Sequence, residues 1–198
     1  NPNNPCGYTV SLEFIRKLAE HFAEIIFVID EAYIEFSDSD SATELVECFP
    51  NIVVLRTFSK AFGMAGLRLG YMCAPLDIIG NVNKIRNGKN VSMIAQKLGL
   101  SALKNFEHVD SWIQKVIKSR TKFEEWCFAN DITFYPSQGN FVMFKVSRCR
   151  ELCSELKAQG IYVRNRDSIV SGCVRVTIGA EPQLSRLISA LEKLRKFL

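Results

Sequence analysis

An apolar strand that leads directly to a lysine is the feature that most constrains this chain. Residues Ile52 to Leu55 are all apolar and follow a Pro-Asn pair, which predicts a short buried strand. Thr57, Ser59 and Lys60 come immediately after it. In an α/β sheet, ligands bind just beyond the carboxyl ends of the strands. Two hydroxyls and one amine are therefore expected at the mouth of a site.

The residues around Lys60 indicate a reactive amine. Phe58 and Phe62 flank it, and partial desolvation by two aromatic rings would favour the neutral amine, which is the better nucleophile toward a carbonyl. Glycines at positions 63, 66 and 70 would let the backbone pass close to a ligand. This is the environment in which a lysine forms a Schiff base. The alternative is a solvated surface lysine beside an ordinary turn.

The first half of the chain alternates helical and strand patterns, which predicts an α/β fold. Ser11 begins an amphipathic helical pattern that ends near Ala23. The apolar run from Ile25 to Ile29 is typical of a parallel strand covered on both faces, and Asp30 ends it. Because a buried carboxylate needs a partner, Asp30 is predicted to be a ligand group.

The second half predicts a long helical region followed by a small α+β domain. A strand at 67–74, a helix at 75–86 and a turn at 87–90 precede helical residues 91–130, which break near Asn105. The remaining pattern is strand 132–135, strand 140–146, helix 150–159, strand 161–164, strand 173–178 and helix 182–197. We therefore expect a mostly parallel sheet in residues 1–105 and a small α+β domain in residues 106–198.

Composition argues against several classes of partner. The net charge is only +4 and the basic residues are dispersed, which disfavours nucleic acid. The apolar stretches are shorter than a membrane span, and no signal pattern opens the chain, so a soluble cytoplasmic protein is expected. The seven cysteines show no C-x-x-C spacing, which fits a reduced interior. Cys149 and Cys153 are predicted to pack as small apolar residues, and no metal site is expected.

The segment TFSKAFGMAGLRLGY at residues 57–71 resembles the cofactor-lysine segment of fold-type I pyridoxal-phosphate enzymes, in the branch similar to histidinol-phosphate aminotransferase. The segments NPNNPCG at 1–7 and DEAY at 30–33 resemble the same family, as do QGNF at 138–141 and VRVTIG at 174–179. The resemblance implies an aspartate aminotransferase-like fold, of which this chain holds part of the large domain and the small C-terminal domain. It also implies pyridoxal 5'-phosphate as the cofactor.

The resemblance assigns the lysine segment to cofactor binding. Lys60 matches the lysine that holds the cofactor and moves a proton during the reaction. Thr57, Ser59 and Arg68 match the residues that hold the cofactor phosphate, a role that suits the planar donors of an arginine. The neutral alternative for Arg68 is an exposed charge on a strand.

Five further residues receive roles by the same resemblance. Asp30 matches the carboxylate that pairs with the pyridine nitrogen, and Asn4 and Tyr33 match the residues that contact the phenolic oxygen. Arg164 and Arg175 match the pair that binds the substrate anion. A half-buried packing tyrosine and a solvated strand arginine are the alternatives for Tyr33 and Arg175.

The function implied is transfer of an amino group between a donor such as histidinol phosphate and a 2-oxo acid such as 2-oxoglutarate, by a homodimer in amino-acid biosynthesis. The chain departs from the family at Cys6, where threonine is usual, and at Asn87 to Asn90, which often border the substrate. A decarboxylase of phospho-amino acids on the same fold is one alternative. A truncated, non-catalytic binding or dimerisation module is another.

The sequence also predicts an incomplete enzyme. Ahead of the Asn-Pro segment the family carries a glycine-containing loop that completes the phosphate site and an aromatic residue that stacks on the pyridine ring. Without them, the sheet is expected to lack strands and to leave an edge and an apolar face uncovered.

Overall fold

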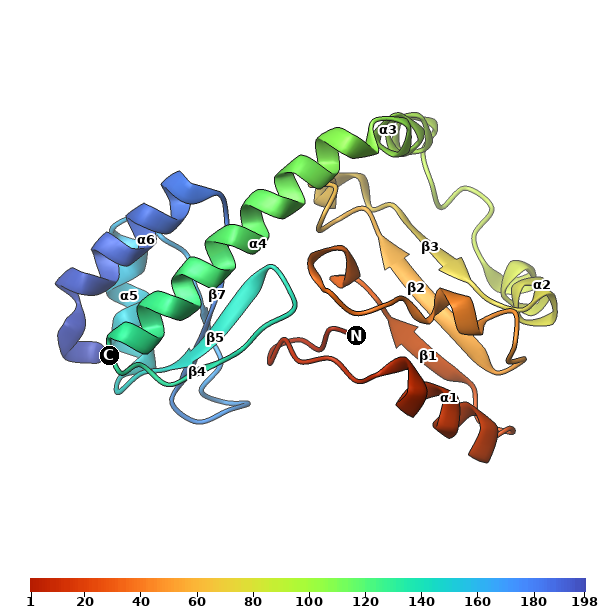
Figure 1. Ribbon diagram of the computed structural model, residues 1–198. Helices are drawn as coiled ribbons and strands as arrows, with labels where there is room; N and C mark the ends of the chain where they lie inside the picture. The colour runs from red at the N-terminus through yellow and green to blue at the C-terminus, as the bar shows by residue number, and fades with distance from the viewer. The chain divides into compact units, whose positions relative to one another are not determined.

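The computed structural model describes residues 1–198 and divides them into two compact units (Figure 1). Unit 1 comprises Asn1–Pro2 and Thr9–Asp110, and unit 2 comprises Asn3–Tyr8 and Ser111–Leu198. The short loop at residues 3–8 thus belongs with the C-terminal part of the chain. No helix combines the length and the apolar character needed to cross a membrane.

Unit 1 is built on a sheet of three strands in the order β1-β2-β3, namely β1 (Phe27–Asp30), β2 (Ile52–Thr57) and β3 (Gly70–Cys73). β1 and β2 are parallel and pair Asp30 with Leu55, whereas β2 and β3 are antiparallel. The sheet is therefore mixed rather than mostly parallel, because the chain turns back after the lysine segment without a crossover helix.

One face of this sheet is covered by helix α1 (Leu12–His21) and by a short 3₁₀ helix at Ala42–Leu45. Ser11 caps α1 as expected, because its Oγ accepts a hydrogen bond from the Phe14 N–H. The helix expected between β1 and β2 is absent, and two 3₁₀ helices, Ile34–Phe36 and Ala42–Leu45, stand in its place. Polar residues at 37–41 interrupt any longer helical pattern there.

The other face of the sheet is open at β1. Val28 is 58% exposed, so the expectation that both faces of this strand are covered is wrong for this chain. β1 and β3 each have a strand neighbour on one side only. The predicted uncovered edge is therefore present, but the face is uncovered only at β1, because Val53, which pairs with Val28 on β2, is 4% exposed.

The helices that follow β3 match the sequence pattern closely. Helix α2 (Leu76–Ile85) begins after Pro75, and α3 (Met93–Lys104) is followed by α4 (Phe106–Ala129). The break falls at Asn105, whose side-chain Nδ2 donates to the Ser101 carbonyl at 2.7 Å. The backbone N–H of Asn105 donates to the same carbonyl at 3.1 Å, so Asn105 closes the last turn of α3.

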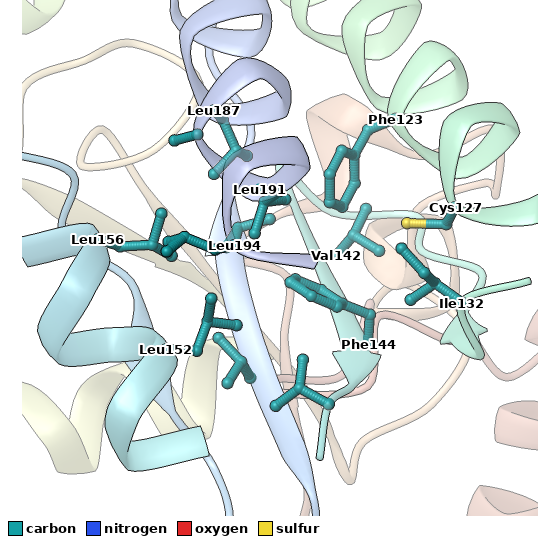
Figure 2. Packing of buried hydrophobic residues seen from close by; sticks show 14 of the residues in the cluster. Phe123, Cys127, Ile132, Val142, Phe144, Leu152, Leu156, Leu187, Leu191 and Leu194 are labelled. Carbon is teal, nitrogen blue, oxygen red and sulfur yellow. The ribbon is translucent and has the colours of Figure 1, made fainter. Parts of the chain in front are cut away.

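Unit 2 confirms the predicted α+β architecture. Its four strands are β4 (Phe134–Tyr135), β5 (Phe141–Lys145), β6 (Arg164–Asn165) and β7 (Cys173–Thr177), in the antiparallel order β4-β5-β7-β6. Helices α5 (Cys149–Ala158) and α6 (Glu181–Lys193) pack with α4 on one face of the sheet. Figure 2 shows this core, in which Phe123, Phe144 and Leu191 are completely buried.

The cysteines of unit 2 are part of this packing. All seven thiols of the chain are free. Burial raises the pKa of Cys127 to about 12 and the pKa of Cys149 to about 11, so neither forms a thiolate readily. Cys149 is buried in the core and Cys153 packs against it, which confirms their predicted role.

We expect the core of unit 2 to depend on Phe123. Replacing Phe123, which is 0% exposed, by alanine should lower the free energy of unfolding by about 3–5 kcal/mol because it leaves a cavity. Phe128 lies on the same helix but is 80% exposed, so Phe128→Ala serves as the matched control. Urea unfolding of both variants measures the difference, and equal losses would contradict the assigned core.

Candidate functional site

Most of the predicted cofactor residues lie together in unit 1, where β1 and β2 end. Because the two strands are parallel, their carboxyl ends meet at the same edge of the sheet. We call this group the lysine cluster. It comprises Asp30, Tyr33, Thr57, Ser59, Lys60 and Arg68.

The structure brings Lys60 and Tyr33 together. The Lys60 Nζ lies 5.2 Å from the centroid of the Tyr33 ring, a cation–π distance, and Tyr33 is buried. Lys60 itself is exposed. The expected desolvation by Phe58 and Phe62 is therefore absent from this chain, and these two rings pack against each other with their centroids 4.6 Å apart.

The hydroxyl groups and Arg68 are held by local backbone contacts. The Ser59 N–H donates to Thr57 Oγ1 at 3.1 Å, and Thr57 Oγ1 donates to the Leu69 carbonyl at 3.4 Å. A 3₁₀ turn at Ala65–Leu67 precedes Arg68, so β3 begins later than the sequence predicts.

Arg68 has an unusual backbone conformation. Its φ of 51° lies in the left-handed region, which costs a residue other than glycine about 1–2 kcal/mol. Its Nη1 donates to the Ala65 carbonyl at 3.1 Å, so the side chain folds back over its own turn. Such strain tends to be retained at ligand-binding positions.

Asp30 ends β1 on the open face of the sheet. Its Oδ1 accepts a hydrogen bond from the Ala32 N–H at 3.1 Å, which fixes the carboxylate relative to the turn that leads to Tyr33. The side chain is exposed, so the argument that burial forces Asp30 to find a partner does not hold in this chain.

A buried network of charges beside the lysine cluster was missed by the sequence analysis. The Arg56 guanidinium donates from Nε to Glu31 at 2.7 Å, from Nη1 to Glu35 at 3.2 Å and from Nη2 to Ser41 Oγ at 2.8 Å. Glu31 is completely buried, and it also accepts from the Ala42 N–H at 2.6 Å and from the Ser41 hydroxyl at 2.7 Å. We call Glu31, Glu35, Ser41 and Arg56 the Arg56 network.

A signal for this network is visible in the sequence. Arg56 continues an apolar strand, where a charge is expected only if it is paired. Glu31 and Glu35 lie on either side of Tyr33. Burial raises the pKa of the Glu35 carboxyl, although Arg56 opposes the shift. Ser41, which belongs to the polar run at residues 37–41, is one of the groups that satisfies Arg56.

The predicted substrate arginines lie together in unit 2. Arg164 on β6 stands directly opposite Arg175 on β7 in the antiparallel ladder. Like charges in this position repel each other, and an anion that accepts from both would remove the repulsion. The Arg175 guanidinium also lies 5.0 Å from the centroid of the Phe141 ring and donates to Asn4 Oδ1.

The loop that carries Asn4 is anchored beside Arg175. The Gln138 N–H donates to the Gly7 carbonyl at 2.7 Å. Gly7 has a φ of 83°, and a Cβ atom on it would lie 2.2 Å from Ser137 Oγ. Only glycine fits this close approach.

Comparison with known proteins gives one matching family and many similar chains. The model of the family "Aminotransferase class I and II" matches residues 1–191. The histidinol-phosphate aminotransferase of Cytophaga hutchinsonii is 35% identical over 196 residues, which is 97% of this chain and 56% of that protein. The chain thus spans about half the length of the curated relatives it matches.

Solved structures share the fold. Histidinol-phosphate aminotransferase from Sinorhizobium meliloti, solved in complex with pyridoxal-5'-phosphate, is 28% identical with a TM-score of 0.88 and is matched over 98% of this chain and 55% of that one. A decarboxylase from Sulfurospirillum multivorans is 29% identical with a TM-score of 0.86, over 98% and 60% of the two chains. These matches confirm the expected aspartate aminotransferase-like fold.

The close fit at Gly7 leads to a test of the Asn4 loop. An alanine in the left-handed conformation costs about 1–2 kcal/mol by itself. Gly7→Ala should lower the free energy of unfolding by more than this, because the new methyl group overlaps Ser137. Gly172→Ala is the control, since Gly172 has a similar φ of 70° and its nearest contact is 3.4 Å away.

Amide exchange locates the effect of these two substitutions. The Gln138 N–H should exchange faster in Gly7→Ala and remain protected in Gly172→Ala, because only the first disturbs the loop contact. Similar exchange in the two variants would show that the loop does not depend on Gly7.

Proposed function

We propose that this chain, which belongs to the class I and II aminotransferase family, is part of a pyridoxal 5'-phosphate-dependent aminotransferase. The carrying observation is the position of the Lys60 amine, beyond the end of β2 and 5.2 Å from the Tyr33 ring that follows the neighbouring parallel strand. A lysine in this position, next to hydroxyl and guanidinium donors, fits a cofactor that has both an aldehyde and a phosphate.

The donor set of the lysine cluster suits each part of this cofactor. Thr57, Ser59 and Arg68 would bind the phosphate through hydroxyl and guanidinium donors. Asp30, whose carboxylate is exposed, would hold a proton at the ring nitrogen, because a nearby negative charge favours the protonated, positively charged ring. Tyr33 would donate to the phenolic oxygen. Pyridoxal 5'-phosphate, when bound, supplies an aldehyde that accepts amino groups and a ring that withdraws electrons.

Lys60 and the arginines would act on the substrate. The Lys60 amine would take a proton from the substrate α-carbon as a general base and, as a general acid, would deliver it to the C4′ carbon of the cofactor. Arg164 and Arg175 would orient the substrate by donating hydrogen bonds to its anionic group, and the Asn4 contact would hold Arg175 in place. Asn4 would also bind the phenolic oxygen of the cofactor.

The names of the relatives support a specific reaction. Histidinol phosphate is the proposed amino donor and a 2-oxo acid such as 2-oxoglutarate the acceptor, because curated relatives at 35–37% identity are histidinol-phosphate aminotransferases. We further propose a cytoplasmic homodimer, in which residues 1–105 belong to the cofactor-binding domain and residues 106–198 form the small domain.

A decarboxylase remains the second candidate, because the solved decarboxylase shares this fold at 29% identity. The two reactions would use the same cofactor residues and differ in which substrate bond is held perpendicular to the cofactor ring. Carbon dioxide release without consumption of a 2-oxo acid would favour the decarboxylase. Amino transfer without gas release would favour the aminotransferase.

Replacing Lys60 by alanine tests the carrying observation. Lys60→Ala, in the polypeptide as the organism makes it, should abolish amino transfer and the retention of the cofactor's visible absorbance after gel filtration. The fold should survive, because the exposed side chain contributes only about 0.5–1 kcal/mol through its contact with Tyr33. Lys84→Ala, at another exposed lysine of unit 1, is the control. Turnover that persists in Lys60→Ala would refute the assignment.

Replacing Arg175 by lysine tests the arginine pair. The ammonium keeps the charge but loses the planar pair of donors, so KM for an anionic amino substrate should rise about tenfold or more. The cofactor should be retained as in the wild type. Arg150→Lys changes an exposed arginine of the same unit and should have no effect. If cofactor and substrate binding fall equally, Arg175 lies elsewhere than in the substrate site.

A further inference from the structure

We infer that Arg56 and Glu31 are positioning residues that hold the lysine cluster in its binding arrangement. The inference rests on the proposed function and concerns side chains that would not touch the cofactor or the substrate. It is carried by the contacts of the Arg56 network, by its burial and by its place on the sheet.

Arg56 joins three separate segments of unit 1. Its Nε reaches Glu31 directly after β1, its Nη1 reaches Glu35 in the 3₁₀ helix at Ile34–Phe36, and its Nη2 reaches Ser41. Each of its three nitrogens therefore fixes a different part of the chain. A lysine could not replace it, because all of its donors lie on one nitrogen, whereas the guanidinium presents three separate nitrogens in a fixed plane.

The contacts of Arg56 bracket Tyr33. Glu31 and Glu35 lie two residues before and after this tyrosine, and both of their carboxylates accept from the same guanidinium. The Glu31 N–H also donates to the Leu55 carbonyl at 2.9 Å, which extends the pairing of β1 with β2 by one residue. The turn that presents Tyr33 to Lys60 is thus tied to β2 at both of its ends.

Because the strands are pleated, the contacts of Arg56 on one face also determine which way the cluster residues on the other face point. Side chains alternate between the two faces of a strand. Ile29 and Val54 belong to the covered face, so Glu31 and Arg56, two residues farther on, face the same way. Asp30 and Thr57 point to the opposite face. Fixing one face fixes the direction of the cluster residues on the other.

Glu31 is suited to this role because it is buried and fully engaged. Its two carboxylate oxygens accept from the Ala42 N–H, the Ser41 hydroxyl and the Arg56 guanidinium. A glutamine of the same size would turn an amide donor toward one of these donors. Glu31→Gln should therefore disturb the arrangement without changing the volume of the side chain.

The experiment compares cofactor binding with stability in four proteins, namely the wild type, Glu31→Gln, Arg56→Lys and a control, in the polypeptide as the organism makes it. Glu181→Gln is the matched control, since it breaks the exposed Lys122–Glu181 pair by the same chemical change. The readouts are the Kd for pyridoxal 5'-phosphate, the pH midpoint of the visible band of the bound cofactor, and the Tm.

We expect Glu31→Gln and Arg56→Lys to raise the Kd about tenfold or more, as loss of outer hydrogen bonds does at metal sites. We also expect a shift in the pH midpoint, because Tyr33 and Asp30 would no longer be oriented toward the ring. Glu181→Gln should match the wild type in all three readouts. A lower Tm with unchanged Kd and midpoint would show a purely structural role and overturn the inference.

Two further outcomes are decided by the same set of measurements. If the Glu31 and Arg56 variants fail to fold, Glu35→Ala decides, because it removes the carboxylate that accepts from Arg56 Nη1 and leaves the pair with Glu31 intact. A raised Kd in that variant supports the inference and an unchanged Kd overturns it. If the wild type itself fails to bind pyridoxal 5'-phosphate, the proposed function is overturned, a result distinct from variants that bind normally.

Discussion

The ion pair between Arg56 and Glu31 is the interaction on which unit 1 depends most. Glu31 is completely buried and only 16% of the Arg56 side chain is exposed, so water cannot reach Glu31 and reaches only a small part of Arg56. Removing one partner of such a pair typically costs about 3–5 kcal/mol, because the other charge stays buried without compensation. Burial therefore requires that both partners of the pair be present and hydrogen-bonded. This requirement fixes the end of β1 against the end of β2, where the cluster residues lie.

The two faces of the unit 1 sheet carry different groups. Its covered face carries the Arg56 network and the apolar core beneath α1, whereas its open face carries Asp30 and Thr57. Unit 2 shows a different arrangement, because Arg164 and Arg175 face each other with like charges across two strands. The Arg56 network is thus held by attraction between opposite charges, whereas the arginine pair of unit 2 places two like charges opposite each other.

Local patterns predicted most of the elements, and they failed where burial decided the outcome. The cap at Ser11 and the break at Asn105 follow from side chains that act on their own neighbourhood. The apolar run of β1 gave the strand correctly but not its environment, since Val28 is exposed. A run of apolar residues indicates that a strand can be buried, but it does not show which other segments pack against that strand.

The sequence by itself determined the family resemblance, most of the helices and strands, and the chemical types present at the proposed site, because these depend on residue identity and short spacing. Only the tertiary structure decided that Lys60 meets the Tyr33 ring, that Arg164 stands opposite Arg175, and that Arg56 binds two glutamates at once. The residues in each of these contacts are far apart in the sequence. Strand pairing and the direction of the side chains bring them together. Periodicity carries no information about such contacts, because it records the face of a residue and not its partner.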